Sequence, residues 1–431
     1  LVAPGFVNLH VHAGPLAMAR LFSDYGRREP FALGFLNYAA PRLGANNPIG
    51  KANGRAAARC TLAELLRYGC TTVVEVGGET GVSPEMLREE ALELRVRVVV
   101  GRGFRSRDYI TDEGNVVRYR RRPDEGKADF VRAVEFSEAV LNEDNPLVDT
   151  MLFALQADTC EPWLLKGAYS AAEELGVKLQ LHAAQGLFEV HTLMQQSGKL
   201  PISYLSELDV LGPQTLLAHV VFISGHPWLP YRLEGELELL ANSGAGVVHC
   251  PQAFARRGMV LSSFERYRQA GIRVAIGTDT FPRDMIQELR WASYTCKIDE
   301  RDFAVADAWS VFSAATDVAA DLLGRPDLGR LAAETRADFM TLDLDSYRVG
   351  PVFDPISALV HAGLGEDICD VYVAGERRVV DGKVQGVNAK SLLQEQAHEA
   401  EESWRGVSKW HPQSLTALDI SVETAARLWE P

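Results

Sequence analysis

Short runs of apolar residues alternate along most of the chain with longer segments whose apolar residues recur at helical spacing. Eight runs predict strands: Phe6–His10, Thr72–Val76, Val96–Gly101, Thr150–Gln156, Val177–His182, Thr215–His219, Gly246–His249 and Val274–Gly277. Six segments predict helices between them: Ala57–Tyr68, Ser83–Leu94, Phe130–Asn142, Ala168–Leu175, Leu233–Ser243 and Ser262–Ala270. Repeated strand–helix units are typical of a parallel sheet. Eight of them predict an α/β fold of the (β/α)8, TIM-like barrel type.

The pattern changes after the helical segment Ala304–Leu323. Residues 337–344 and 371–380 alternate between apolar and polar, which predicts antiparallel strands with a hairpin at 374–376. The tail from Ser391 returns to helical spacing. We therefore expect a barrel over residues 1–324, a small β-sandwich segment with its connection over 325–390, and a C-terminal helical tail over 391–431.

Composition and charge exclude some classes of binding partner for this chain. The formal net charge of −14 argues against nucleic acid, since phosphate binding needs clustered Lys and Arg. The one basic run, Arg118–Arg122, precedes Pro123 and is interpreted as a solvated turn at a helix start. We find neither a membrane-spanning stretch nor a leader, and the six scattered cysteines indicate reduced residues. We expect a soluble cytoplasmic protein that binds a small molecule and forms a homo-oligomer through its helical tail.

Histidines and one aspartate stand at the ends of the predicted strands. His10 and His12 are two positions apart, so both imidazoles share one face of a strand. Taken alone, this pair is also compatible with two core or surface histidines. His182, His219 and Asp279 each close a further apolar run, and the carboxyl ends of barrel strands open onto one face. Imidazole and carboxylate are common ligands of zinc-like ions, which favours a metal site there.

Five blocks of sequence resemble the amidohydrolase superfamily, specifically its triazine hydrolase and cytosine deaminase-like branch. They are Pro4–His12, Leu181–Gln185, Ala218–His219, Val248–Pro251 and Gly277–Asp279, in that order. The segment Leu331–Leu344 also resembles the return of these enzymes to their β-sandwich. Relatives normally have a leading stretch before the Pro-Gly-Phe segment, so we expect either that the chain has been trimmed at this end or that the sandwich is incomplete, and the metal site does not depend on which.

The resemblance implies a role for each of these polar residues. His10, His12, His182 and Asp279 are expected to bind a divalent metal ion, while His219 orients the attacking water and Asp279 accepts its proton. Zinc is the first expectation, with cobalt, iron or manganese compatible with the same ligands. Relatives with two metal ions use a Lys at the end of the fourth strand, where this chain has Gln156, and Lys166 lies too far along to replace it. We therefore expect one ion.

Gln185 departs from the deaminase pattern, which has Glu three residues after the histidine of the fifth strand. An amide cannot deliver a proton, and a positioned acid–base group is typically worth about 10²- to 10⁴-fold in rate. We therefore expect hydrolysis of a carbonyl C–N bond in an amide, urea, carbamate or thiocarbamate. Glu189 could substitute for the missing acid, but we interpret it as a solvated or capping carboxylate. Gln185, Gln156 and His249 are the expected substrate contacts, although His249 is equally compatible with a structural role.

Other readings of the chain remain open. One is an aminohydrolase that deaminates or dechlorinates a nitrogen heterocycle, and another is a metal-binding homologue without catalysis. The stretch Gly277–Met285 looks similar to hydrolases of phenylurea and thiocarbamate herbicides. The long connection Ala13–Lys51 contains several aromatic residues and is interpreted either as a binding wall or as a small core of its own.

Overall fold

The computed structural model of this protein describes residues 1–14, 54–77, 82–111, 117–261, 263–411 and 413–420. The aromatic segment Ala13–Lys51 falls almost wholly outside these residues, as does the end of the C-terminal tail. Among the described helices, we find none that combines the length and the apolar character needed to cross a membrane.

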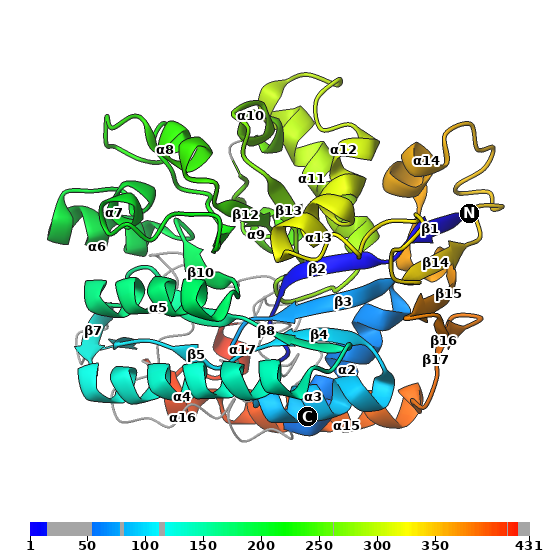
Figure 1. Ribbon diagram of the computed structural model, residues 1–431, viewed down its shortest axis with the longest axis horizontal. Helices are drawn as coiled ribbons and strands as arrows, with labels where there is room; N and C mark the ends of the chain where they lie inside the picture. The colour runs from blue at the N-terminus through cyan, green and yellow to red at the C-terminus, as the bar shows by residue number, and fades with distance from the viewer. Residues whose placement is uncertain (15–53, 78–81, 112–116, 262, 412, 421–431) are drawn as a thin grey trace.

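Parallel strands form the barrel that the sequence predicts (Figure 1). Its strands are β2 (Phe6–Val11), β3 (Cys70–Glu75), β4 (Arg97–Val100), β5 (Gly103–Phe104), β8 (Val148–Thr150), β9 (Leu152–Gln156), β10 (Leu179–Ala183), β11 (Thr215–His219), β12 (Gly246–His249) and β13 (Val274–Ile276). The strand orders are β2-β3-β4-β8 and β5-β9-β10-β11-β12-β13. Val11 and Asp279 bridge the two outer edges, so β2 and β13 close the barrel.

Two of the predicted strands differ in the structure. The run Val96–Gly101 contains β4 and is followed by the short strand β5, and the run Thr150–Gln156 is divided between the end of β8 and β9. Glycine allows the tight packing at this point: a Cβ atom on Gly101 would lie 2.3 Å from the carbonyl oxygen of Met151. The pairing resumes beyond the break in the same register, because β4 pairs with β8 (Val98 with Val148) and β5 pairs with β9 (Gly103 with Phe153).

Helices cover the outside of the barrel. They are α2 (Gly54–Arg67), α3 (Pro84–Leu94), α4 (Pro123–Glu143), α5 (Pro162–Leu175), α6 (Leu187–Ser197), α7 (Pro201–Glu207), α8 (Glu236–Ser243), α9 (Pro251–Ala255), α10 (Phe264–Gln269), α11 (Met285–Glu300), α12 (Ala308–Ala314) and α13 (Asp317–Leu323). The prediction of one helix over Ala304–Leu323 is wrong, because α12 and α13 are separate. The carbonyl oxygen of Ala315 accepts a hydrogen bond from the Val7 backbone N–H of β2 (2.9 Å), which draws it away from the helical ladder.

The basic run Arg118–Arg122 is not a turn, which corrects our prediction. It forms most of β7 (Val117–Arg121), which pairs antiparallel with β6 (Arg107–Thr111). Acidic side chains neutralise the positive charge of this run: Arg120 pairs with Asp108 at 2.7 Å, and Arg121 pairs with Glu161 at 2.6 Å. The arginines are therefore engaged within this hairpin and with the barrel.

A five-stranded antiparallel sheet lies at one end of the barrel. Its strands are β1 (Val2–Pro4), β14 (Phe339–Leu342), β15 (Ile368–Val373), β16 (Glu376–Val380) and β17 (Lys383–Val384), in that order. The predicted hairpin is present, since Ala374 and Gly375 both have positive φ between β15 and β16. The first residues of the chain therefore contribute a strand to this sheet and then enter the barrel, which makes the appendage and the barrel continuous.

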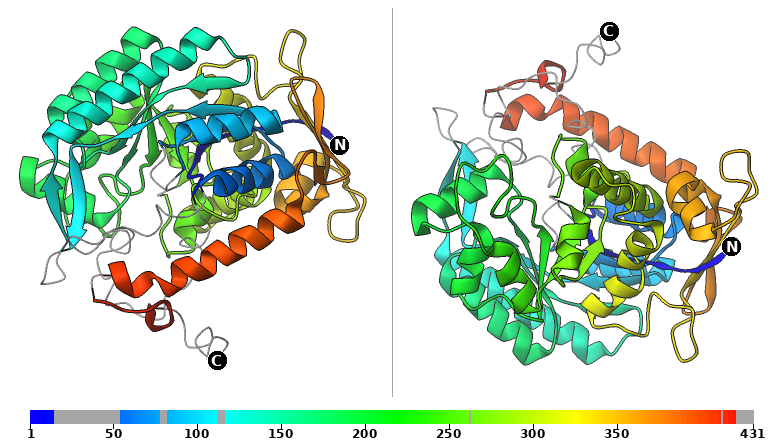
Figure 2. Two further views of the ribbon diagram at one scale, coloured as in Figure 1. Left: turned by 90° about the horizontal axis from the view of Figure 1, so that it is seen from below. Right: turned by 90° about the horizontal axis from the view of Figure 1, so that it is seen from above.

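The helical tail packs along the barrel. It consists of α15 (Ala389–Arg405), α16 (Val407–Trp410) and α17 (Ala417–Ile420) in the described residues. Figure 2 shows α15 running beside α2, and Leu392 packs there against Ala56 and Cys60. The apolar side of α15 is thus used within the chain.

A buried ion pair joins the antiparallel sheet to the barrel. Arg97 of β4 and Asp338, just before β14, are both 1% exposed, and Arg97 Nη2 lies 3.2 Å from Asp338 Oδ2. The other oxygen of Asp338 accepts the Ala374 backbone N–H at 2.6 Å. This carboxylate therefore satisfies buried donors from both parts of the fold.

Asp338→Ala should lower the free energy of unfolding by about 3–5 kcal/mol, because it leaves the Arg97 charge buried without its partner. Urea denaturation measures the loss, with Asp345→Ala at an exposed position as the control. The double variant Asp338→Ala/Arg97→Met should recover part of the loss. An Asp338→Ala protein as stable as wild type would contradict this role.

Candidate metal centre

The two histidines of β2 point into the barrel. His10 is completely buried, and its Nδ1–H donates to Gln180 Oε1 at 2.7 Å. That bond directs the lone pair of His10 Nε2 inward, and this atom has no hydrogen-bond partner among the described residues. Burial, followed by the neighbouring His182, lowers the pKa of His10 to about 3, so its imidazole is neutral and available as a ligand.

His182 and Asp279 come to the same point from β10 and from the end of β13. His182 Nδ1 is hydrogen-bonded to the Leu155 carbonyl, and its Nε2 lies 3.3 Å from His12 Nε2. Asp279 Oδ1 is 3.4 Å from His12 Nε2 and 3.8 Å from His10 Nε2. Two nitrogens on a tetrahedral ion, each about 2.0–2.1 Å from it, would be roughly 3.3 Å apart. The measured separation fits that geometry.

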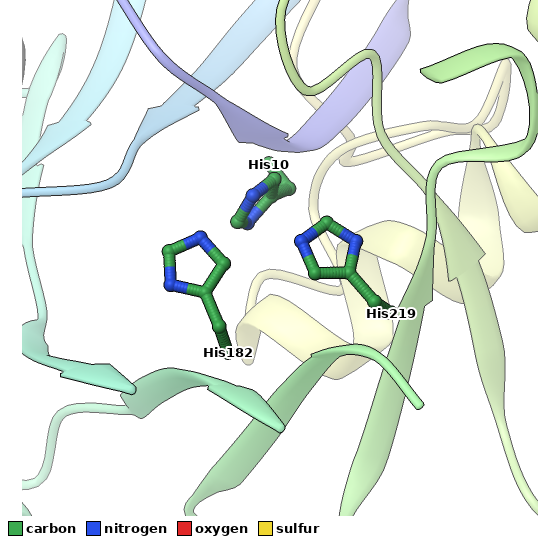
Figure 3. A group of neighbouring side chains, drawn as sticks. All are labelled: His10, His182 and His219. Atoms are coloured by element: carbon green, nitrogen blue, oxygen red, sulfur yellow. The ribbon is translucent and has the colours of Figure 1, made fainter. Parts of the chain in front are cut away.

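His219 completes the cluster from the end of β11. Figure 3 shows the rings of His10, His182 and His219 converging on one space, with the His219 centroid 5.0 Å from that of His10. Neither ring nitrogen of His219 has a hydrogen-bond partner among the described residues. Burial lowers its pKa well below the usual value, and the other histidines of the cluster add to the effect. It is a neutral imidazole with both nitrogens available.

These side chains form two overlapping groups that could hold a cation. His10, His182 and His219 form one, and His10, His12 and Asp279 form the other, with the ligand atoms of each group within 4.8 Å of one another. Buried imidazole nitrogens without partners are costly unless something binds them. A divalent metal ion would satisfy them, and the nitrogen and oxygen ligands suit zinc.

Backbone hydrogen bonds across the barrel seam place Asp279. The carbonyl oxygen of His10 accepts from the N–H groups of Thr278 (3.1 Å) and Asp279 (2.9 Å), and the His12 N–H donates to the Asp279 carbonyl at 2.7 Å. Asn8 supports the same turn, since its Nδ2 donates to Thr278 Oγ1 at 2.8 Å. The ends of β2 and β13 are therefore held together at the residues that carry the cluster.

Two side chains that the sequence analysis missed hold the histidines. Gln180 donates from Nε2 to the Leu9 carbonyl (2.9 Å) while accepting from His10, so it connects β10 to β2 inside the barrel. Arg283 donates to the His12 carbonyl (3.0 Å) and pairs with Glu64 of α2 (2.9 Å). Gln180 stands two positions before His182, on the same face of its strand. This spacing is the sequence pattern from which its position inside the barrel could have been predicted.

The three predicted substrate contacts are all buried near the ends of strands. Gln156 ends β9, and its Nε2 donates to Glu189 Oε2 at 3.3 Å. The Gln185 N–H donates to the same oxygen at 2.9 Å. His249 ends β12, is 2% exposed, and contributes to the lowered pKa of His219. The structure thus links Gln156 and Gln185 through one oxygen of Glu189, while His249 is near enough to His219 to add to the lowering of its pKa.

Glu189 is not a solvated carboxylate, which corrects one of our two interpretations. It is fully buried in the first turn of α6, where Oε1 accepts the Ala184 N–H at 2.8 Å and Oε2 accepts from Gln185 and Gln156. Its capping role is confirmed, because both oxygens hold the turn after β10. Burial, together with Asp158, raises its pKa to about 8. Lys166 lies exposed on α5, away from the end of β9.

Gln180→Leu should raise the dissociation constant for zinc about 10- to 100-fold, because His10 loses the acceptor that fixes its tautomer. Chelator competition on the purified protein measures the change. Gln180→Glu, which keeps an acceptor, should retain most of the affinity, and Gln195→Leu on the surface of α6 is the matched control. Unchanged zinc affinity in a folded Gln180→Leu protein would refute the positioning role.

Glu189 should make the stability depend on pH. A carboxyl whose pKa is raised from 4.5 to about 8 by folding stabilises the native state fully below pH 4.5, and the contribution is lost as the pH rises to about 8. The stability advantage of wild type over Glu189→Gln should therefore shrink between pH 5 and pH 8 in urea denaturation. A stability advantage over Glu189→Gln that stays constant across this pH range would contradict this account.

Known proteins resemble this chain in sequence and in fold. Residues 1–379 match the amidohydrolase family. A 5-methylthioadenosine/S-adenosylhomocysteine deaminase of Natronomonas pharaonis is 29% identical over 93% of this chain and 86% of its own. A zinc-bound adenosine deaminase from Xanthomonas campestris has a TM-score of 0.77 at 22% identity, over 93% of this chain and 85% of its own. Atrazine chlorohydrolase from Arthrobacter aurescens, complexed with zinc, has a TM-score of 0.71 at 21% identity, over 93% and 88%. The chain belongs to the amidohydrolase family.

Proposed function

We propose that this metal-dependent hydrolase cleaves a carbonyl C–N bond of a small molecule, in an amide, urea, carbamate or thiocarbamate. One observation carries the proposal: buried imidazoles and one carboxylate converge on one point, while the residue three positions after His182, where an acid would be needed to act on a heterocycle, is Gln185. We further propose that the enzyme is cytoplasmic, which its six free cysteines favour.

His10, His12, His182 and Asp279 are the residues that we propose to hold one divalent ion, with zinc first among the candidates. The bound ion would lower the pKa of water to about 7 and polarise the substrate carbonyl. The zinc-containing structural neighbours support this choice of metal. Cobalt, iron and manganese accept the same ligands.

The residues of the chain would then move the protons. Asp279, 1% exposed and 3.4 Å from His12, accepts a proton from the attacking water. Water oxygen forms a bond to the carbonyl carbon, the C–N bond breaks, and Asp279 returns the proton to the leaving nitrogen. His219 stands next to this point with both ring nitrogens available, so it can hydrogen-bond the water or the carbonyl oxygen as charge develops. No other proton donor is required.

Gln185 decides between the two classes of reaction. Hydrolytic deamination of a heterocycle requires a proton on a ring nitrogen, and an amide cannot supply one. Glu189 is a poor substitute, because its two oxygens already accept three hydrogen bonds from Ala184, Gln185 and Gln156. Gln185 and Gln156 instead offer amide groups that can orient a carbonyl substrate without transferring a proton.

A second candidate function is hydrolysis of an amino or chloro substituent on a nitrogen heterocycle. The observation in its favour is that the relatives named above include a 5-methylthioadenosine/S-adenosylhomocysteine deaminase and an adenosine deaminase. It would need a proton donor other than Gln185. This candidate predicts ammonia or chloride as the product, whereas the leading one predicts an organic amine.

Product analysis after loading with zinc separates the two. Ureas, carbamates and anilides are offered in parallel with amino-substituted purines, pyrimidines and triazines. We expect organic amines from the first panel, and a loss of at least about 10²-fold in kcat/KM for Asp279→Asn. His398→Gln, on the exposed face of α15, is the control and should keep full activity.

The variant Gln185→Glu tests, in the same experiment, whether an acid at this position is needed. If the proposal holds, restoring a carboxyl group does not improve cleavage of the carbonyl substrates. Ammonia from the heterocycles with wild-type enzyme, and none of the amines, would overturn the leading proposal in favour of the second.

A further inference from the structure

The backbone turns sharply at the end of β11, where His219 stands. His219 has a φ of 81° and Val220 a φ of 48°, so two consecutive residues other than glycine lie in the left-handed region. This conformation is rare for a β-branched residue such as Val220, and it persists only where the surrounding contacts hold it. The turn that carries the His219 imidazole is therefore strained and needs support from the rest of the fold.

Backbone hydrogen bonds to the end of β10 supply one part of that support. The Val220 N–H donates to the Ala183 carbonyl at 3.1 Å, and the Val221 N–H donates to the Ala184 carbonyl at 3.0 Å. These bonds hold the N–H groups of the turn to the neighbouring strand end.

Tyr267 binds a carbonyl of the same turn. It lies on α10, is completely buried, and its hydroxyl donates to the Val220 carbonyl oxygen at 2.8 Å. Burial raises the pKa of Tyr267, so the hydroxyl stays protonated and remains a donor. The Tyr267 ring packs in the main hydrophobic core, which fixes its position. The hydroxyl therefore fixes the peptide that follows Val220, one residue beyond His219.

The His219 ring depends on this backbone support because no hydrogen bond holds the ring itself. Neither of its nitrogens has a hydrogen-bond partner among the described residues, whereas Nδ1 of His10 and Nδ1 of His182 are both hydrogen-bonded. Ring packing restrains it instead: its centroid lies 5.3 Å from that of His182, which it faces in Figure 3, and 4.7 Å from that of the buried Phe254. The backbone turn and these ring contacts together set the orientation of His219.

We propose that Tyr267 is a positioning residue, which keeps His219 in the orientation in which its imidazole hydrogen-bonds the attacking water. The inference rests on the proposed function, in which His219 has that role. Tyr267 acts through the backbone and contacts neither the metal ion nor the substrate, while Phe254 supports the same imidazole from the side of its ring. An imidazole held in this way keeps both nitrogens for the reaction and still has a defined position.

Tyr267→Phe removes only the hydroxyl group. In the zinc-loaded protein, kcat for the carbonyl substrates should fall about 10- to 100-fold, while KM and the dissociation constant for zinc stay unchanged. Tyr68→Phe is the matched control and should keep full kcat, because the Tyr68 hydroxyl donates to Glu366 at the opposite end of the barrel, just before β3. An unchanged kcat in Tyr267→Phe would overturn the proposal. A parallel loss of zinc affinity would also overturn it, because Tyr267 would then act through the metal ligands.

Nitrogen NMR of the histidine side chains tests the positioning without a substrate. In zinc-loaded protein that contains isotope-labelled histidine, the ring signals of His219 are assigned with His219→Gln. They should shift or broaden in Tyr267→Phe, while the signals of His10 stay in place. Phe254→Leu keeps an apolar side chain but loses the ring contact, so it should disturb the same signals.

Unchanged His219 signals in both variants would overturn the positioning role. A wild-type enzyme that cleaves none of the carbonyl substrates would overturn the proposed function instead, and the NMR comparison would still decide the role of Tyr267.

Discussion

Closure of the barrel between β2 and β13 is the constraint on which the site depends. The His10 carbonyl accepts two backbone N–H groups from the Thr278–Asp279 turn, and the His12 N–H returns a third bond to Asp279. Gly277 makes this contact possible, because a Cβ atom there would lie 2.8 Å from His10 Cβ. One set of hydrogen bonds thus completes the fold and fixes three of the proposed ligands relative to one another.

The loops that follow β10, β11 and β12 are each held by a buried glutamate. Buried glutamates accept backbone N–H groups after three successive strands: Glu189 holds Ala184 and Gln185, Glu236 holds Ser224, and Glu288 holds Gln252. Glu236 also accepts the Ser203 N–H of α7. Burial raises the pKa of each carboxyl. Desolvating these groups is costly, and their hydrogen bonds offset part of that cost. These hydrogen bonds hold the loops at the same end of the barrel as the histidine cluster.

Much of this arrangement follows from sequence patterns. The apolar runs predicted the barrel strands, and the polar residues that close them, such as His182 and Asp279, converge because parallel strands share one open end. The breaks at Met151 and Ala315 were missed, because they come from contacts between distant segments and leave no local signal. The hairpin at Arg118–Arg122 was missed for a related reason: its charges are neutralised by Asp108 and Glu161, which lie elsewhere in the sequence.

The central claim is that three imidazoles and one carboxylate of this cluster bind a divalent ion. X-ray absorption at the zinc K-edge of the loaded protein measures the ligand set most directly. The account predicts nitrogen or oxygen neighbours at about 2.0–2.1 Å, with outer-shell scattering from about three imidazole rings. A sulfur neighbour at about 2.3 Å, or a spectrum without imidazole scattering, would contradict it, because the ion would then lie outside the cluster of His10, His12, His182 and Asp279.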